Sequence, residues 1–178
     1  MKFLKIILTA VLFVSGLAAS AQGRIPLLDK ASGHRVSFDY SYLVSLKGED
    51  MHEVTSGKMT VEDNCFSLTG LGLSIISDGE SRWTLDKEAK EALVESVDED
   101  DVITNPAILI SSYAGFGDNL KVNSSGSDYI DLTLRLDEKS SARFILKNIV
   151  YSNPKGEKKD FTLDVKSLGP DYVVTDLR

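Results

Sequence analysis

The stretch HRVSFDYSYLVSL, residues 34–46, decides the fold class, because apolar and polar side chains alternate along most of its length. Such alternation is typical of a β-strand that buries one face and exposes the other. The apolar face carries Val36, Phe38, Tyr40, Tyr42, Val44 and Leu46. The opposite face carries mainly serines and Asp39. A half-buried strand needs neighbouring strands, so the rest of the chain must supply them.

Short alternating segments recur along the chain. The expected strands are GKMTVE (residues 57–62), CFSLTGLGLSII (65–76), DYIDLTLRL (128–136), ARFILKNIVY (142–151) and DFTLDVKSL (160–168). Turn-forming sequences such as KGED (47–50) and SNPKGEKKD (152–160) separate strands. Gly70 and Gly72 lie within one expected strand segment and predict a bulge or a bend there. The pattern predicts an antiparallel meander that forms a barrel or a strongly curved sheet.

Two segments favour helices instead. RIPLLDKAS (24–32) predicts about two turns of helix that start around Pro26. TNPAILISSYAGF (104–116) is the better candidate, with Thr104 or Asn105 as the cap, Pro106 at the first helical position and Gly115 at the end. An apolar helix among strands needs a surface to cover. The fold class is therefore α+β, mostly antiparallel β.

The N-terminal residues, MKFLKIILTAVLFVSGLAASAQG, combine a basic start, an apolar run over residues 6–14 and a small-residue site that ends at Ala21. This pattern predicts a secretory signal peptide, residues 1–21, with cleavage after Ala21. A membrane anchor is the weaker interpretation, because the apolar run is short for a bilayer. Residues 22–178 are then a single exported domain, for which we expect a monomer.

The formal net charge of −7 disfavours nucleic acid and anionic lipid headgroups as partners. Cys65 is the only cysteine, so no intramolecular disulfide is possible, and a buried, unreactive thiol is expected. His34 and His52 show no metal-binding spacing, and no nucleophile elbow, phosphate loop or dinucleotide motif is present. The acidic run VDEDD (97–101) is interpreted as a solvated turn. We therefore expect no enzyme activity, metal or cofactor.

The sequence ISDGESRWTLD (76–86) contains Asp78 and Gly79, which predict a tight hairpin turn before Trp83. This segment resembles the LolA/LolB-type lipoprotein carriers of the bacterial cell envelope. TNPAILI (104–110) and GKMTVEDNCF (57–66) resemble further family motifs. The resemblance implies an incomplete, strongly curved β-barrel, with a short helical lid over an apolar cavity.

The chain also departs from the family pattern. Glu62, Asp63 and Asn64 stand where the family usually has a basic residue and Pro before the residue that matches Phe66. The family's basic residue is linked to ligand handover, so the release step is in question. The aromatic-Asx-Pro that usually follows the tryptophan is replaced by residues 85–87, Leu-Asp-Lys. The chain is therefore interpreted as a divergent relative.

Resemblance and alternation together give a candidate ligand site. The concave face is expected to carry Phe38, Tyr40, Tyr42, Phe66, Ile75, Trp83, Phe144 and Phe161. The expected lid contacts are Ile108, Leu109 and Tyr113, with Gly115 and Gly117 as a hinge. Periodicity alone favours a solid core, in which Trp83 would be an ordinary core residue, and the family resemblance reverses this preference.

The resemblance implies a periplasmic carrier that binds the acyl chains of lipoproteins and shuttles them from the inner to the outer membrane. Its partners would be acylated lipoproteins or another lipid, an inner-membrane ABC-type release complex and an outer-membrane acceptor. One alternative is a related binding or sensing module for another envelope lipid or peptide, without a shuttle role. A secreted hydrolase that uses scattered carboxylates is the alternative from another class.

Overall fold

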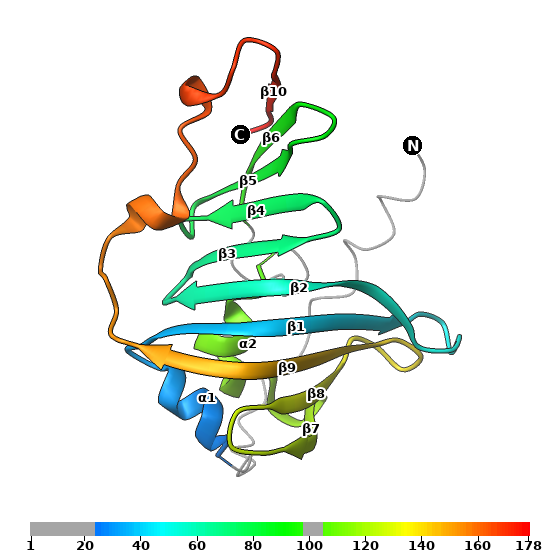
Figure 1. Ribbon diagram of the computed structural model, residues 1–178. Coiled ribbons are helices and arrows are strands. Elements are labelled where there is room, and N and C mark those ends of the chain that lie inside the picture. Colours follow the sequence, from blue (N-terminus) through cyan, green and yellow to red (C-terminus); the bar gives the residue numbers. More distant parts are fainter. Residues whose placement is uncertain (1–23, 98–104) are drawn as a thin grey trace.

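The computed structural model describes residues 24–97 and 105–178 (Figure 1). The predicted signal peptide, Thr104 and nearly all of the acidic run 97–101 lie outside the described residues. The described strands form one sheet in the order β10-β6-β5-β4-β3-β2-β1-β9-β8-β7. All neighbouring pairs are antiparallel except β10 and β6, which are parallel. β7 and β10 lie at opposite ends of this order and do not pair, so the curled sheet is an incomplete barrel.

The predicted segments 34–46, 57–62, 65–76, 128–136 and 142–151 all form strands, whereas the strands at 91–96, 120–125 and 173–176 were not predicted. The strands are β1 Arg35–Ser45, β2 His52–Glu62, β3 Cys65–Gly70, β4 Leu73–Ser77, β5 Ser81–Asp86, β6 Glu91–Ser96, β7 Leu120–Ser125, β8 Ile130–Arg135, β9 Ser141–Ser152 and β10 Val173–Asp176. The helical elements are α1 Pro26–Ala31, α2 Ile108–Ser111 and the 3₁₀ segments η2 Tyr113–Asn119, η3 Lys158–Phe161 and η4 Val165–Ser167. α1 starts at Pro26, as predicted.

Gly70 and Gly72 interrupt the predicted strand segment, but the feature is a hairpin turn between β3 and β4 and not a bulge. Gly70 pairs with Leu73, which leaves Leu71 and Gly72 as the two turn residues. Their φ angles are 51° and 79°. Two consecutive positive φ angles match the right-handed twist of the flanking strands. Glycine adopts this conformation without strain, whereas a leucine does so rarely.

The predicted helix over residues 104–116 is shorter in the structure. α2 is a single turn, and its first residues have no side-chain cap, so Asn105 does not cap it. At Ser112 the backbone leaves the helical region with φ −137°, and the 3₁₀ segment η2 follows. Ser111 donates its hydroxyl to the Ala107 carbonyl, a local bond that competes with regular helix geometry.

The predicted strand DFTLDVKSL (160–168) is also wrong: the segment contains η3, η4 and an extended link. Its position explains why. The chain must travel from β9 to β10, and the strand order places β1 to β6 between these two strands. A segment that crosses strands cannot join their hydrogen-bond ladder, whatever its alternation. Figure 1 shows this connection leaving β9 and passing the ends of β3 and β4 before it reaches β10.

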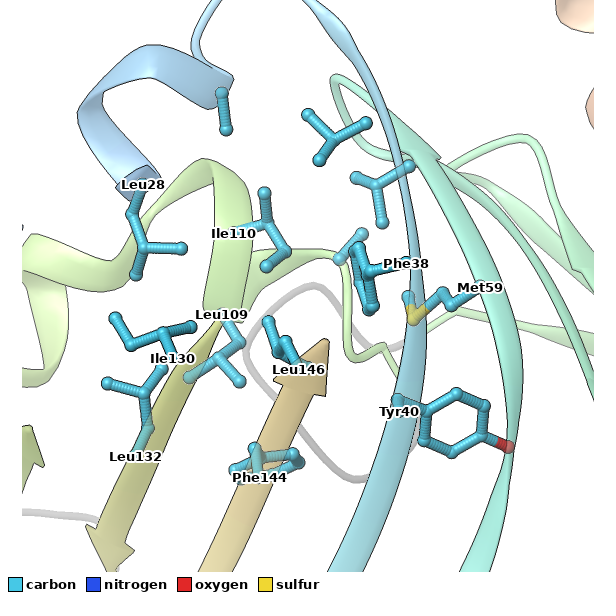
Figure 2. Packing of buried hydrophobic residues seen from close by; sticks show 14 of the residues in the cluster. Leu28, Phe38, Tyr40, Met59, Leu109, Ile110, Ile130, Leu132, Phe144 and Leu146 are labelled. Atoms are coloured by element: carbon cyan, nitrogen blue, oxygen red, sulfur yellow. The ribbon is translucent and has the colours of Figure 1, made fainter. Parts of the chain in front are cut away.

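Strand register assigns side chains to the two faces of the sheet, because directly paired residues point the same way. The inner face is the one that α1 and α2 cover. It carries the main core, which includes Phe38, Met59, Phe66, Ile130 and Leu146. Figure 2 shows Leu28 of α1 and Leu109 and Ile110 of α2 packed over this face.

A candidate apolar ligand-binding cavity

A cavity of about 300 Å³ lies on the inner face, between the sheet and α2. Strands β1 to β4 and β9 form its wall, and the Pro106–Ile110 region contributes the other side. Its lining residues are Phe38, Tyr40, Tyr42, Val54, Thr55, Met59, Leu68, Gly70, Leu71, Leu73, Ile75, Pro106, Leu109, Ile110, Phe144 and Leu146. None of these side chains carries a charge at neutral pH, and the polar groups among them are hydroxyls. Such a surface suits an apolar ligand.

Two glycines lie in the same row of the sheet as Tyr40. Gly57 pairs directly with Tyr40 on β1 and with Gly70 on β3, so the three residues form one row across the sheet. A Cβ at Gly70 would lie 2.9 Å from the Tyr40 hydroxyl, and a Cβ at Gly57 would lie 1.7 Å from the Thr69 carbonyl oxygen. The row therefore tolerates no larger residue unless the backbone or Tyr40 moves.

The cavity opens at the end of the sheet where β3 turns into β4. Leu71, at the hairpin tip, is 74% exposed, and Val54 on β2 is 43% exposed. Tyr40, Met59 and Leu109 at the other side of the cavity are buried. Apolar side chains thus continue from a buried floor to a solvent-exposed rim, which gives a chain-like ligand a path inward.

The cover over the cavity is anchored in the core. Leu109 and Ile110 are both buried, and Figure 2 shows Leu109 directed toward Ile130, Leu132 and Leu146 on β8 and β9. Of the expected lid contacts, Leu109 lines the cavity. Ile108 packs against the core beside it.

Tyr113, the third expected lid contact, bonds to the α1 region and not to the cavity. Its hydroxyl donates to the Asp29 carboxylate at 2.5 Å and accepts from the Ile25 amide at 3.3 Å. Tyr113 therefore ties η2 to α1 and does not line the cavity. Gly117 has φ 52° and ψ −139° at a kink within η2, a conformation open mainly to glycine. The hinge role expected for Gly115 and Gly117 stays a prediction.

The structure brings together most of the residues expected on the concave face. Phe38, Tyr40, Tyr42, Ile75 and Phe144 all line the cavity, and the Tyr42 and Phe144 rings stack with centroids 5.1 Å apart. Phe66 lies on the same face but is only 1% exposed, within the core next to Val61. It is a packing residue behind the cavity wall.

Trp83 and Phe161 do not belong to this face, which corrects the sequence-based expectation. Trp83 pairs with Ile76 of β4, the neighbour of the cavity residue Ile75, so its ring lies on the outer face. There it is 6% exposed and pairs across β5 and β6 with Val94. The hairpin at Asp78 and Gly79 is confirmed, with the Glu80 and Ser81 amides donating to the Asp78 carboxylate.

Phe161 lies on the outer side as part of the C-terminal segment. It is 1% exposed and lies beside Cys65. Cys65 points to the outer face, because it precedes the inner-facing Phe66 on the same strand. The Arg35 guanidinium lies 5.0 Å from the centre of the Phe161 ring. Arg35 also pairs with Asp160 at 2.9 Å, so this region fastens the segment to β1.

Glu62, one of the departures from the family pattern, has a structural role in this region. It is buried, it accepts a hydrogen bond from the Gly156 amide at 2.7 Å, and it lies 3.5 Å from Arg35. Cys65 is buried, as predicted, and burial raises the pKa of its thiol. A buried thiol with a raised pKa is a poor nucleophile.

Several cavity residues were not expected from the sequence. They are Val54, Thr55, Met59, Leu68, Gly70, Leu71, Leu73, Pro106, Ile110 and Leu146. The signal that would have found many of them is pairing across three successive hairpins, since Phe38 pairs with Met59, Met59 with Leu68 and Leu68 with Ile75. This row of paired residues is the central part of the wall.

Within residues 24–97 and 105–178, no group of three His, Cys, Asp or Glu side chains is arranged to hold a metal ion. No helix in the same residues has the length and hydropathy needed to cross a membrane.

The sequence matches no protein-family model and no curated protein. The fold is similar to those of several solved structures, which include the following two. One is an uncharacterized conserved protein from Thermus thermophilus, at 7% identity and a TM-score of 0.46, over 85% of this chain and 95% of that chain. The other is the LolA superfamily protein NE2245 from Nitrosomonas europaea, at 10% identity and a TM-score of 0.41, over 78% of this chain and 97% of that chain.

Proposed function

We propose that this protein is a non-enzymatic periplasmic carrier that holds acyl chains, such as those of lipoproteins, in the apolar cavity. The observation that carries the proposal is the uncharged lining of a cavity of about 300 Å³ with an exposed apolar rim. Buried CH₂ groups contribute about 0.8 kcal/mol each, so a long chain leaves a membrane only for an equally apolar surface. The cavity wall is such a surface.

The proposal also includes a shuttle role, in which the protein moves acylated cargo from the inner to the outer membrane. It requires a donor that releases acylated cargo at the inner membrane and an acceptor at the outer membrane. The cavity rim at Leu71 and Val54 is the place where cargo would enter and leave, since it joins solvent to the buried floor.

A second candidate is a binding module that holds an envelope lipid without delivering it. The position of Glu62 favours this candidate, because its contacts with Arg35 and Gly156 secure the C-terminal segment on the outer side of the sheet. The residue is thus not free to take part in handover. Reconstituted transfer between donor and acceptor vesicles separates the two candidates, since only a carrier speeds the exchange of acylated cargo.

The test of acyl-chain binding uses two neighbouring isoleucines as a matched pair. Ile75 lines the cavity, and Ile76 points to the opposite face of the same strand. Both are half-buried, and both would incur the same loss of strand propensity on replacement by Asp. Ile75→Asp places a charge in the cavity wall, whereas Ile76→Asp does not.

Native mass spectrometry of protein purified without detergent, followed by organic extraction, gives the readout. We expect a co-purifying acylated species in the wild type and in Ile76→Asp, and its loss in Ile75→Asp. Far-ultraviolet circular dichroism checks that both variants are folded. An apo mass for the wild type that persists after incubation with palmitic acid and with an acylated lipoprotein would refute the proposal.

A further inference from the structure

One polar pair interrupts the apolar wall of the cavity. The Tyr40 hydroxyl and the Thr55 hydroxyl lie 3.4 Å apart, and both residues line the cavity. Tyr40 is 7% exposed, so the residue as a whole is buried in the cavity wall. Figure 2 shows the Tyr40 ring extending from β1 toward the neighbouring strand, with the hydroxyl at its far end.

The surroundings of this pair are built to keep the hydroxyls accessible. Gly70 stands beside them, and a Cβ there would lie 2.9 Å from the Tyr40 oxygen and 3.1 Å from the Thr55 oxygen. The missing side chain leaves room for both groups at the wall. A 3.4 Å separation is long for a hydrogen bond between hydroxyls, so the pair is weakly coupled and retains hydrogen-bonding capacity.

The Tyr40 hydroxyl is the better donor of the two. Burial raises its pKa above 10.0, so the phenol stays neutral and keeps its proton at physiological pH. A buried donor without a strong partner is costly, and a ligand acceptor at this position removes that cost. Thr55 is half-buried and can donate its own proton to the Tyr40 oxygen at the same time.

We propose that Tyr40 and Thr55 form a carbonyl subsite, in which Tyr40 donates a hydrogen bond to the ester or amide carbonyl of an acyl ligand. This rests on the proposed acyl-chain binding and adds a ligand class to it: acyl chains are preferred over alkyl chains that lack the carbonyl. The uncharged lining favours esters and amides over free carboxylates.

The test compares two uncharged lipids of equal chain length, 1-palmitoylglycerol and its ether counterpart 1-O-hexadecylglycerol. Affinities are measured by displacement of the uncharged fluorophore N-phenyl-1-naphthylamine. One hydrogen bond predicts a preference for the ester of roughly three- to tenfold. Tyr40→Phe keeps the ring and removes the donor, so the ester affinity falls to that of the ether, which itself is unchanged.

Tyr151→Phe is the control, because Tyr151 lies outside the cavity and donates its hydroxyl to the Leu27 carbonyl. It keeps the ester preference. Thr55→Val also keeps the preference, since the donor remains. An infrared measurement with ¹³C-carbonyl 1-palmitoylglycerol gives a second readout: the bound carbonyl stretch lies at lower frequency in the wild type than in Tyr40→Phe.

The outcomes distinguish this subsite from the cavity as a whole. Equal affinity of the wild type for ester and ether would overturn the subsite and leave acyl-chain binding intact. Binding of neither lipid would overturn both. A folded Tyr40→Phe variant that keeps the ester preference, or a Thr55→Val variant that loses it, would also overturn the role of Tyr40 as donor.

Discussion

Replacing Trp83 should damage stability without damaging the cavity. The ring is 6% exposed on the outer face, and removal of a buried aromatic side chain to Ala costs about 3–5 kcal/mol. For a domain of this size, each kcal/mol lowers Tm by about 2–4 °C, so Trp83→Ala predicts a fall of roughly 6–20 °C. Trp83→Leu fills part of the space and should show a smaller fall.

Thermal unfolding followed by circular dichroism measures this loss, since the chain has a single tryptophan and the variants lack its fluorescence. Below their Tm, both variants should retain bound lipid as the wild type does. A brominated acyl chain should quench Trp83 emission in the wild type only weakly, because the sheet separates ring and ligand. Strong quenching, or a folded Trp83→Leu variant that no longer holds lipid, would refute the assignment of faces.

Two further predictions concern stability. Leu71→Asn should raise the free energy of unfolding by roughly 0.5–1 kcal/mol in urea denaturation, because Leu71 has φ 51° and is 74% exposed; a fall would mean that its packing at the rim outweighs the strain. Hydrogen bonds from Arg143 lower the pKa of Asp131, so the ionised Asp131 side chain stabilises the folded state. Its contribution to the free energy of unfolding is complete above the unfolded-state pKa of about 3.9 and is lost as the pH falls through the lower folded-state pKa. Asp131→Asn should therefore cost roughly 1–3 kcal/mol at pH 7 and progressively less as the pH falls below about 3.9, and a cost independent of pH would contradict the ion pair as its origin.

The sequence pattern located the inner wall well where alternation was clean. On β1, polar residues separate Phe38, Tyr40 and Tyr42, so only one phase of the strand can face the core. The same reasoning failed at Trp83 for a definite reason. Ile75 and Ile76 are adjacent, so each face of β4 carries an isoleucine, and alternation does not say which of the two shares a face with Trp83.

The turn after β4 then decides which isoleucine shares a face with Trp83. Ser77 pairs with Arg82, which brings Ile76 opposite Trp83. A shift of the β4–β5 register by one residue would have placed the ring on the inner face of the sheet. The resemblance to carriers supplied a fold and a cavity but could not supply this register, because register is fixed by the length of the particular turn.

The C-terminal error has a different origin. DFTLDVKSL alternates like a strand, and its half-buried Leu163 and Val165 do contact protein. Alternation reports only that one side of an extended segment is covered. Whether the backbone also joins a ladder depends on strand order, which is a long-range property that local periodicity does not contain.

The two faces of the sheet are covered unequally, and this links stability to ligand binding. On the outer face, Trp83 and Val94 are fully packed, and contacts such as Arg35 to Asp160 fasten the C-terminal segment on that side. On the inner face, the helices cover the β8–β9 side, while Leu73 and Ile75 stay only half-buried. An apolar sheet face is stabilised when another layer covers it, so the apolar area left open on β3 and β4 does not contribute to the stability of the chain alone.

Under the proposed function, a ligand that fills the cavity would cover this area. It would raise the free energy of unfolding in proportion to the logarithm of its free concentration over Kd. Gly70 is where the two demands conflict, because a larger residue would fill the cavity, but its Cβ would lie 2.5 Å from the Ser56 carbonyl oxygen and 2.9 Å from the Tyr40 hydroxyl.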